Sequence, residues 1–185
     1  QGLVETPNPS ALFLGGGGER PSGAAVFAGV EGSRPVLVEI QALAAATSYG
    51  TPRRAVVGWD SARLAMILAV LETRCGLSFS GRDVYLSVAG GLRITEPAAD
   101  LAVAAALISA LVDHPLPSHC VVFGEVALSG EVRPAGRTDL RMKEAAKLGF
   151  EQAYAPPQKK NGASGVKITQ IKHIADLAAA LGAVE

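Results

Sequence analysis

The sequence is poor in the residue types that most often mark a chemical site. Its 185 residues include two cysteines, three histidines and only 5% aromatic residues. Cys75 and Cys120 lie far apart and form no Cys-x-x-Cys unit, which predicts two reduced thiols. The densest group of possible metal ligands is Asp113, His114, His119 and Cys120. No second group completes a four-ligand site, so we predict that the chain binds no metal.

The sequence also lacks an excess of charge of either sign. Seventeen basic and seventeen acidic residues cancel, whereas a strong binder of polyanions usually carries a basic excess. Nucleic-acid binding would therefore need a local basic patch, or the added affinity of several copies in an oligomer. No apolar run approaches the length of a membrane span, and the N-terminus has no signal-peptide layout. We expect no membrane partner, and Gln1 in place of Met indicates a fragment of a longer chain.

Motifs for nucleotide binding and for hydrolysis are missing. A P-loop needs G-x-x-x-x-G-K-[ST] before a helix, but the glycine run Gly15–Gly18 has no such lysine and precedes a predicted strand. No serine occupies a G-x-S-x-G nucleophile elbow. Because catalytic triads assemble in space, the sequence does not rank the remaining serines. We predict a surface loop at the glycine run and no hydrolase chemistry.

Small aliphatic residues are abundant, and hydrophobic residues make up 49% of the chain. Strand and helix patterns alternate, and hairpin-like strand pairs interrupt them. This order predicts an α+β fold, with a mixed sheet packed with helices, rather than a doubly wound Rossmann sheet. The expected strands are 24–30, 35–43, 83–89, 151–155 and 166–171, with two more within 120–132. The expected helices are 61–75, capped by Asp60 or Ser61, and 97–113, 140–148 and 173–181.

Arginines are the most informative polar residues. Arg53 and Arg54 lie near Tyr49 in a predicted loop, 44–58, for which a lead into another short strand stays open. Arg133, Arg137, Arg141 and Lys143 are grouped around the end of the hairpin predicted within 120–132 and the helix that follows it. Lys159 and Lys160 lie in a polar loop near the C-terminus. Guanidinium groups suit phosphate contacts. The same residues are also typical of a solvated surface with acidic partners nearby, here Asp139, Glu131 and Glu144. The residues alone leave both interpretations open.

Several segments, in order and over essentially the whole chain, resemble one family. They are NPSALFL (8–14), RPVLVEIQAL (34–43), TPRR (51–54), WDSARLAMILAVLETRCGL (59–77), VAGGLRITEPAADLAVAAAL (88–107), and the motifs GEVALSGEVRPAGR and EAAKLGF within 124–150. Together they resemble the C-terminal Lon-protease-like domain of the bacterial RadA (Sms) family of DNA repair and recombination proteins. The resemblance implies a Lon proteolytic domain fold, which is like that of ribosomal protein S5 domain 2, over 24–185, after a linker arm at 1–23.

The same resemblance lets the protease dyad be checked residue by residue. Lon-type proteases use a serine within a D-G-P-S-A-G stretch, and Ala98 stands at that position. Their lysine follows a G-x-V-x-P-x-G-G-L motif, which 130–139 matches with Asp139 at the lysine position. A methyl group cannot attack a carbonyl, and Asp139 has no nucleophile to activate. The resemblance thus implies a domain with no catalytic residues and no enzymatic activity.

The resemblance further implies a role in homologous recombination and branched-DNA processing. It implies a hexameric, DNA-dependent ATPase of the bacterial cytoplasm, acting on single-stranded or branched DNA, with a recombinase as a further partner. ATP, magnesium and zinc would belong to N-terminal modules, and this fragment would need no cofactor. We expect the domain to support the hexamer and to bind DNA through Arg53, Arg54, Arg63, Arg82, Arg137 and Arg141. The alternatives are a purely structural oligomerisation scaffold and a protein-docking module without DNA contact.

Overall fold

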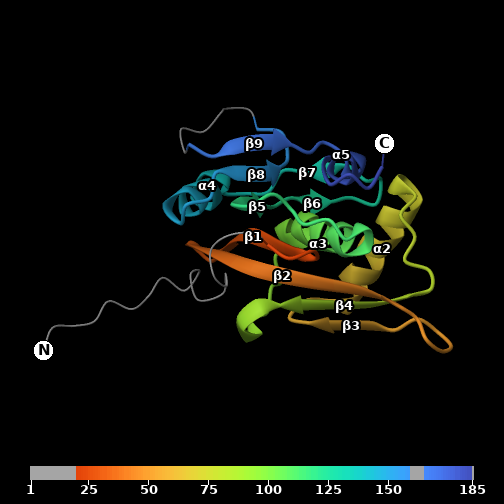
Figure 1. Cartoon of the computed structure of the whole chain (residues 1–185). Coiled ribbons are helices and arrows are strands. Elements are labelled where there is room, and N and C mark those ends of the chain that lie inside the picture. Colours follow the sequence, from red (N-terminus) through yellow and green to blue (C-terminus); the bar gives the residue numbers. More distant parts are fainter. Residues whose placement is uncertain (1–19, 159–164, 185) are drawn as a thin grey trace, which may run out of the picture.

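The computed structural model describes residues 20–158 and 165–184, which form one mixed seven-stranded sheet with helices packed on it (Figure 1). The strand order is β3-β4-β2-β1-β5-β8-β9, and a second small sheet pairs β6 with β7. This arrangement confirms the predicted α+β class. The strands are β1 (Ala24–Glu31), β2 (Arg34–Ala46), β3 (Arg54–Val57), β4 (Arg82–Val88), β5 (Cys120–Val122), β6 (Glu125–Val126), β7 (Val132–Arg133), β8 (Gln152–Ala155) and β9 (Lys167–Gln170).

Antiparallel and parallel pairing are combined in the main sheet. Strand β2 pairs antiparallel with both β1 and β4, whereas β3 is parallel to β4, and β5, β8 and β9 continue in parallel from β1. At 13 residues β2 is long, so it spans about 40 Å at roughly 3.3 Å per residue. We call its start, beside the turn Gly32–Ser33, the turn end of the sheet. Its other limit, beside the loop Thr47–Arg53, is the loop end.

Four helices cover the described part of the sheet: α2 (Ser61–Cys75), α3 (Asp100–Val112), α4 (Thr138–Lys147) and α5 (Ile174–Ala180). Helix α3 packs on β1 and β2, and both α2 and α5 contact α3. The residues of α3 from Asp100 to Ser109 are all buried, because its alanines let sheet and helices approach closely on every side. This helix is therefore the centre of the core, as its position in Figure 1 illustrates.

Helix α2 begins and ends where the sequence predicts. The Asp60 side chain accepts a hydrogen bond from the Ala62 N–H at 2.8 Å, so Asp60 is the cap rather than Ser61. Gly76 ends the helix at φ 68°, in the left-handed region that glycine adopts without a Cβ clash. Both ends of α2 are therefore set by local sequence, and they position the helix beside β3.

Two predicted elements have the wrong limits at the loop end. Strand β2 continues to Ala46 instead of ending at Leu43, because β4 pairs with it over that whole stretch. Strand β3 is the short strand left open after the loop, but it already begins at Arg54, which was expected in the loop and pairs in register with Val84. The exposed loop between the two strands is consequently shorter than predicted and begins at Thr47.

Two other predicted elements are divided. The helix expected over 97–113 consists of a 3-10 turn, η2 (Pro97–Ala99), followed by α3; another such turn, η1 (Ala89–Gly91), follows β4. The hairpin expected within 120–132 is split among β5, β6 and β7. Its break has a clear cause, since Gly124 donates its N–H to the Ala98 carbonyl at 2.8 Å and accepts from Leu101 at 3.0 Å. These bonds draw the chain away from the main sheet.

Within the described residues, no helix has the length and apolar character needed to cross a membrane. Among those residues no three His, Cys, Asp or Glu side chains gather as potential metal ligands. Arg20 pairs with Glu39 on β2 and so fastens the start of the described chain to the sheet. The glycine run at 15–18, residues 1–19 of the predicted linker arm, and Lys159–Lys160 lie outside the described residues.

Candidate functional site

The positions that would hold a protease dyad carry no nucleophile. Ala98 lies in η2, is 5% exposed, and uses its carbonyl to accept the Gly124 N–H. Asp139 is exposed in the first turn of α4. Cys120 is no substitute nucleophile, because burial raises the pKa of its thiol to about 12 and keeps it protonated at neutral pH. Neither vacated position retains a group able to attack a peptide bond.

A buried ion pair braces the turn end. The Arg141 guanidinium from α4 pairs with the Glu96 carboxylate just before η2. Arg141 also donates to the carbonyls of Ala28 (2.9 Å) and Gly136 (2.8 Å), and Glu96 accepts the Val30 N–H at 3.0 Å. One pair of side chains therefore joins α4, β1 and the segment that leads into α3.

This geometry removes Arg141 from the predicted DNA-contact set. The residue is 3% exposed, and its guanidinium already bonds to a carboxylate and two carbonyls. A phosphate could reach it only if that network broke, which would leave a buried charge uncompensated. Arg137, at the start of α4, is exposed and donates to the Gly32 carbonyl at 2.9 Å. It ties the helix to the β1–β2 turn while staying at the surface.

Arg63 forms a second structural ion pair. Asp100 is fully buried at the start of α3, and Arg63 from α2 grips both of its oxygens, with Nε to Oδ1 at 2.8 Å. The Val126 N–H donates to the same carboxylate at 3.0 Å. Burial raises the pKa of Asp100 against the lowering effects of Arg63 and Val126, and the bond to Asp100 raises the pKa of Arg63. Arg63 therefore holds α2 to α3, and its remaining exposure is partial.

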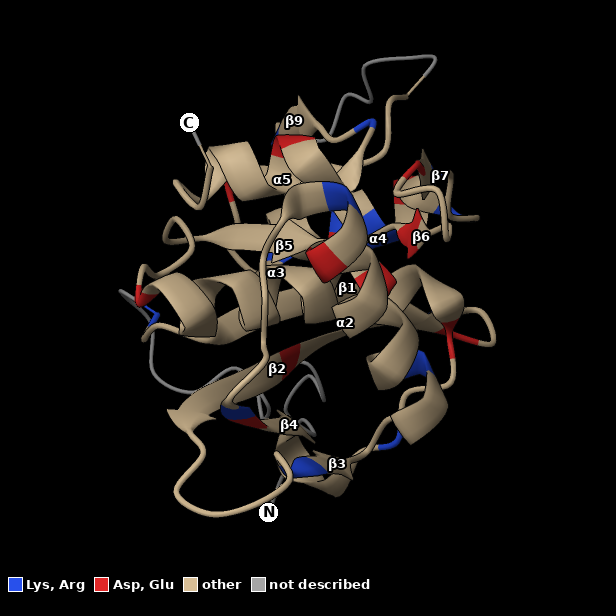
Figure 2. Cartoon of the chain, turned by 90° about the vertical axis from the view of Figure 1, so that its right-hand side faces the viewer, with Lys and Arg blue, Asp and Glu red and all other residues tan. Residues whose placement is uncertain are grey.

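The loop end gathers a different set of arginines. Parallel pairing brings the starts of β3 and β4 together, and with them Arg53, Arg54 and Arg82. Figure 2 looks toward this side of the molecule, where basic residues on β3 and β4 lie close together. The Asp83 carboxylate accepts the Arg53 N–H (2.8 Å) and the Thr47 hydroxyl (3.1 Å), so one side chain holds both ends of the loop.

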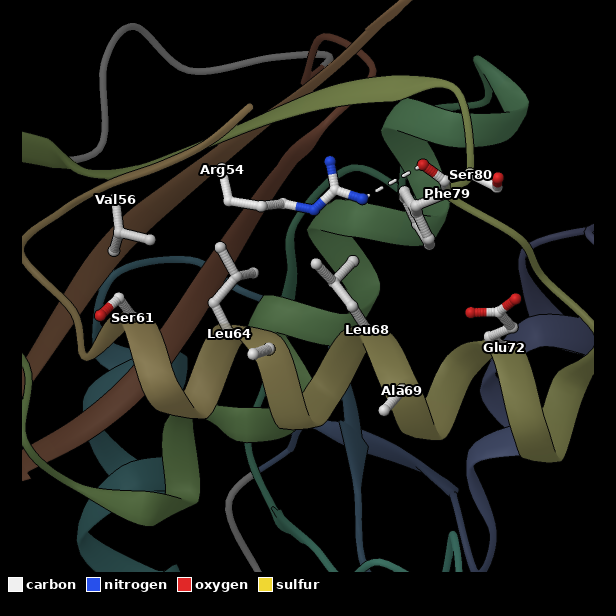
Figure 3. Close-up of a pocket in the computed structure, with 10 residues that line it drawn as sticks. Arg54, Val56, Ser61, Leu64, Leu68, Ala69, Glu72, Phe79 and Ser80 are labelled. Atoms are coloured by element: carbon white, nitrogen blue, oxygen red, sulfur yellow. Dashed lines mark hydrogen bonds between the residues drawn. The ribbon is translucent and has the colours of Figure 1, made fainter. Parts of the chain in front are cut away.

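Arg54 is engaged with backbone carbonyls. Its guanidinium donates to the carbonyls of Arg53 (3.1 Å), Phe79 (3.3 Å) and Arg82. Figure 3 shows the side chain stretched above α2 toward Phe79. Arg54 therefore fastens β3 to the turn that precedes β4, and it acts on the position of the loop end rather than as a free cation.

Arg53 and Arg82 complete this end of the sheet. Arg53 is exposed and Arg82 half-buried, and within residues 20–158 and 165–184 neither guanidinium has a hydrogen-bond or ion-pair partner. An unpartnered guanidinium keeps all its donors for an external anion. Of the six predicted contacts, these two are the ones that the fold both clusters and leaves available.

A hollow of about 390 Å³ lies between β3 and α2, next to the loop end (Figure 3). Its floor is apolar, formed mainly by Val56, Leu64, Leu68 and Phe79, and Glu72 stands at one side. The hollow contains no nucleophile paired with a base. We therefore assign no catalytic role to the hollow. The arginines are the main chemical feature of the loop end.

Sequence reasoning missed the acidic partners. Glu96, Asp100 and Asp83 set the roles of three arginines, yet each pairs with a residue far away along the chain. No local pattern identifies such pairs. The one available signal was the position of Asp83 at the start of a predicted strand, where a carboxylate commonly bonds to a neighbouring loop.

The comparison with known families defines the class. Residues 63–175 match the family of the Lon protease (S16) C-terminal proteolytic domain. The chain belongs to this family.

Individual curated relatives show a more specific similarity. The chain is 61% identical over 155 residues to DNA repair protein RadA of Brucella abortus (strain 2308), a match that covers 84% of this chain and 33% of the relative. It is 52% identical over 181 residues to DNA repair protein RadA of Rickettsia bellii (strain RML369-C), covering 98% and 40%. RadA of Synechocystis sp. is 47% identical over 173 residues. These matches confirm the resemblance seen in the sequence segments, and the chain spans only 33–40% of the length of these relatives.

Proposed function

We propose that this chain is the non-proteolytic Lon-like domain of a DNA repair ATPase and that its loop end contacts DNA. The repair role is supported by the relatives, which are DNA repair proteins of the RadA family. The DNA contact rests on one observation: the Arg53 guanidinium, on a loop that Asp83 anchors, has no partner among the residues that the structure describes. ATP, magnesium and zinc would act in other modules of the parent protein, with a recombinase as a partner of the whole.

The proposed mechanism is electrostatic. Arg53 and Arg82 bind backbone phosphates, while Arg54 holds the carbonyls that shape the loop. Each phosphate contact releases condensed counterions, so affinity falls with rising salt. Because the chain has no net charge, one copy binds weakly. A hexamer would repeat the loop end around a ring and multiply the affinity.

The absence of proteolysis is the second part of the proposal. Ala98 offers a methyl group where a nucleophile is needed, and Asp139 lies exposed at the position of the base. The nearby Glu96–Arg141 pair is fully committed to structural bonds. The domain therefore keeps the protease shape as a support for assembly and for DNA contact.

The test is a titration of fluorescently labelled single-stranded DNA, read by anisotropy at two salt concentrations. It compares the chain with an Arg53→Ala/Arg82→Ala variant. We expect the variant to lose about two phosphate contacts, which flattens the salt dependence by about one unit of slope per arginine. Arg34→Ala is the matched control, because Arg34 is equally exposed but lies at the turn end. We expect it to bind like the unaltered chain.

The competing scaffold hypothesis makes the opposite prediction. If the domain only supports oligomerisation, neither the chain nor either variant binds DNA at either salt concentration. Sizing of the same samples by light scattering shows whether either substitution alters assembly. A loss of affinity with unchanged assembly supports direct contact by the loop end.

A further inference from the structure

Tyr49 is the most exposed large hydrophobic side chain of the loop end. It lies in the loop between β2 and β3 and is 93% exposed, whereas the other exposed large hydrophobic side chains within 20–158 and 165–184 are exposed by 63% or less. The chain has only three tyrosines, and Tyr154 is buried. An aromatic ring exposed to this degree leaves both of its faces open for stacking against a ligand outside the chain.

The loop that carries this ring is tied down on both sides. Thr47 donates its N–H to the Gly81 carbonyl at 2.9 Å and its hydroxyl to Asp83, and the Arg53 N–H donates to the same Asp83 oxygen. Gly50 turns the chain at φ 63°, a conformation that a residue with a Cβ rarely adopts. The five residues between the two anchors therefore hold Tyr49 outside the folded body, where the ring has no core to pack against.

The ring shares its loop with a free cation. Arg53 ends the same loop with an unpartnered guanidinium, and Arg82 lies at the start of the neighbouring strand. Surfaces that bind single-stranded nucleic acid combine these two elements, basic groups along the backbone and aromatic rings on which bases stack. A duplex stacks its own bases inside the helix, so it offers phosphates to the arginines but no free base face to the ring.

We propose that Tyr49 is a base-stacking residue and that it makes the loop end prefer single-stranded over double-stranded DNA. This inference rests on the proposed DNA contact and adds to it a preference for one form of DNA. Arg53 and Arg82 bind phosphates of either form, and Tyr49 adds binding energy only where an unpaired base is available. The preference resides in the ring, so phenylalanine preserves it and an aliphatic side chain does not.

The test measures the affinity of the full chain for a single-stranded oligonucleotide and for the matching duplex. Tyr49→Leu is expected to weaken single-strand binding about 5- to 150-fold, the range for losing one stacked base, and to change duplex binding less than twofold. Tyr49→Phe is expected to bind both forms like the unaltered chain. Tyr85→Leu is the matched control, because Tyr85 is 37% exposed on β4, outside the loop. A single 2-aminopurine in the strand reports stacking directly by its quenched fluorescence.

The outcomes separate this inference from the proposed function. Equal single-strand affinity for Tyr49→Leu and the unaltered chain, with Arg53→Ala/Arg82→Ala still impaired, overturns the stacking role and leaves the DNA contact intact. Equal losses on single strand and duplex also overturn it, because they indicate a damaged loop. Absence of binding to both DNA forms, in the chain and in its assembled parent, removes the proposed function and the stacking role together.

Discussion

The two ends of the sheet contain the same kind of side chain in opposite situations. At the turn end, Arg141 is 3% exposed and bonds to Glu96 and two carbonyls. At the loop end, Arg53 is exposed, and within the described part of the chain its guanidinium has no partner. The difference shows that an arginine count predicts little. The burial of each guanidinium and the acid beside it decide whether it braces the fold or faces a ligand.

The turn end contains a buried ion pair. Buried charge is tolerated there because Glu96 and Arg141 neutralise each other and satisfy the neighbouring backbone, and Arg141 lies 5.6 Å from the centre of the Phe123 ring. The loop end has no such closed network. We therefore expect substitutions at the turn end to change stability, and substitutions at the loop end to change binding.

The largest expected effect is on the Glu96–Arg141 pair. Glu96→Gln removes the negative charge and leaves the Arg141 guanidinium buried and uncompensated, which costs about 3–5 kcal/mol of unfolding free energy. Urea denaturation followed by circular dichroism measures this loss. A change below about 1 kcal/mol would mean that Arg141 is solvated in solution, and it would return Arg141 to the set of possible DNA contacts.

The double variant Glu96→Gln/Arg141→Met sharpens the same comparison. Removing both partners leaves no buried charge. The double variant should therefore lose less unfolding free energy than Glu96→Gln and Arg141→Met lose together. Full additivity would instead show that the two side chains stabilise the fold independently. Neither variant is expected to change the salt dependence of DNA binding once folded protein is compared at equal concentration.

Much of the fold follows from local sequence, whereas the division between the two ends does not. The Asp60 cap and the Gly76 stop fix α2 within one short window, so its limits were predictable. The pairing of Glu96 with Arg141 depends on how η2 and α4 pack together, and that of Asp100 with Arg63 on how α2 packs against α3. A single sequence carries no signal for such contacts. The predicted DNA-contact set accordingly mixed structural arginines with free ones.

The hairpin expected within 120–132 forms around its predicted turn, but its first strand is divided into β5 and β6. Its residues have strand propensity and a turn at Ser129-Gly130, and both features are real. Gly124, however, bonds to Ala98 and Leu101, which are distant in sequence. These hydrogen bonds between distant segments outweighed the local strand pattern, because strand propensity depends strongly on tertiary context.

Arg54 tests the comparison inside the loop end itself. Arg54→Met removes charge-assisted bonds to three carbonyls, which should cost about 1–2 kcal/mol, since these groups are partly exposed. Arg53→Met, at the adjacent position, removes no bond of the side chain and should change stability by less than about 0.5 kcal/mol. Thermal denaturation of the two variants side by side measures the difference. Equal stability would show that Arg54 is as free as its neighbour.

The smallest expected effect tests whether the burial of an arginine or its position in the sheet decides its role. Arg137 lies at the turn end but is exposed, makes one bond to the Gly32 carbonyl at 2.9 Å, and has φ 61°. If burial decides the role, Arg137→Ala costs only about 0.5–1 kcal/mol, the value of one hydrogen bond. Arg137→Gly loses the same bond but relieves the left-handed backbone, so it should be more stable than the alanine variant by about 1 kcal/mol. Urea midpoints measure both. A loss above about 2 kcal/mol for Arg137→Ala, with no recovery in Arg137→Gly, would show instead that the whole turn end acts as one structural unit, whatever the exposure of its arginines.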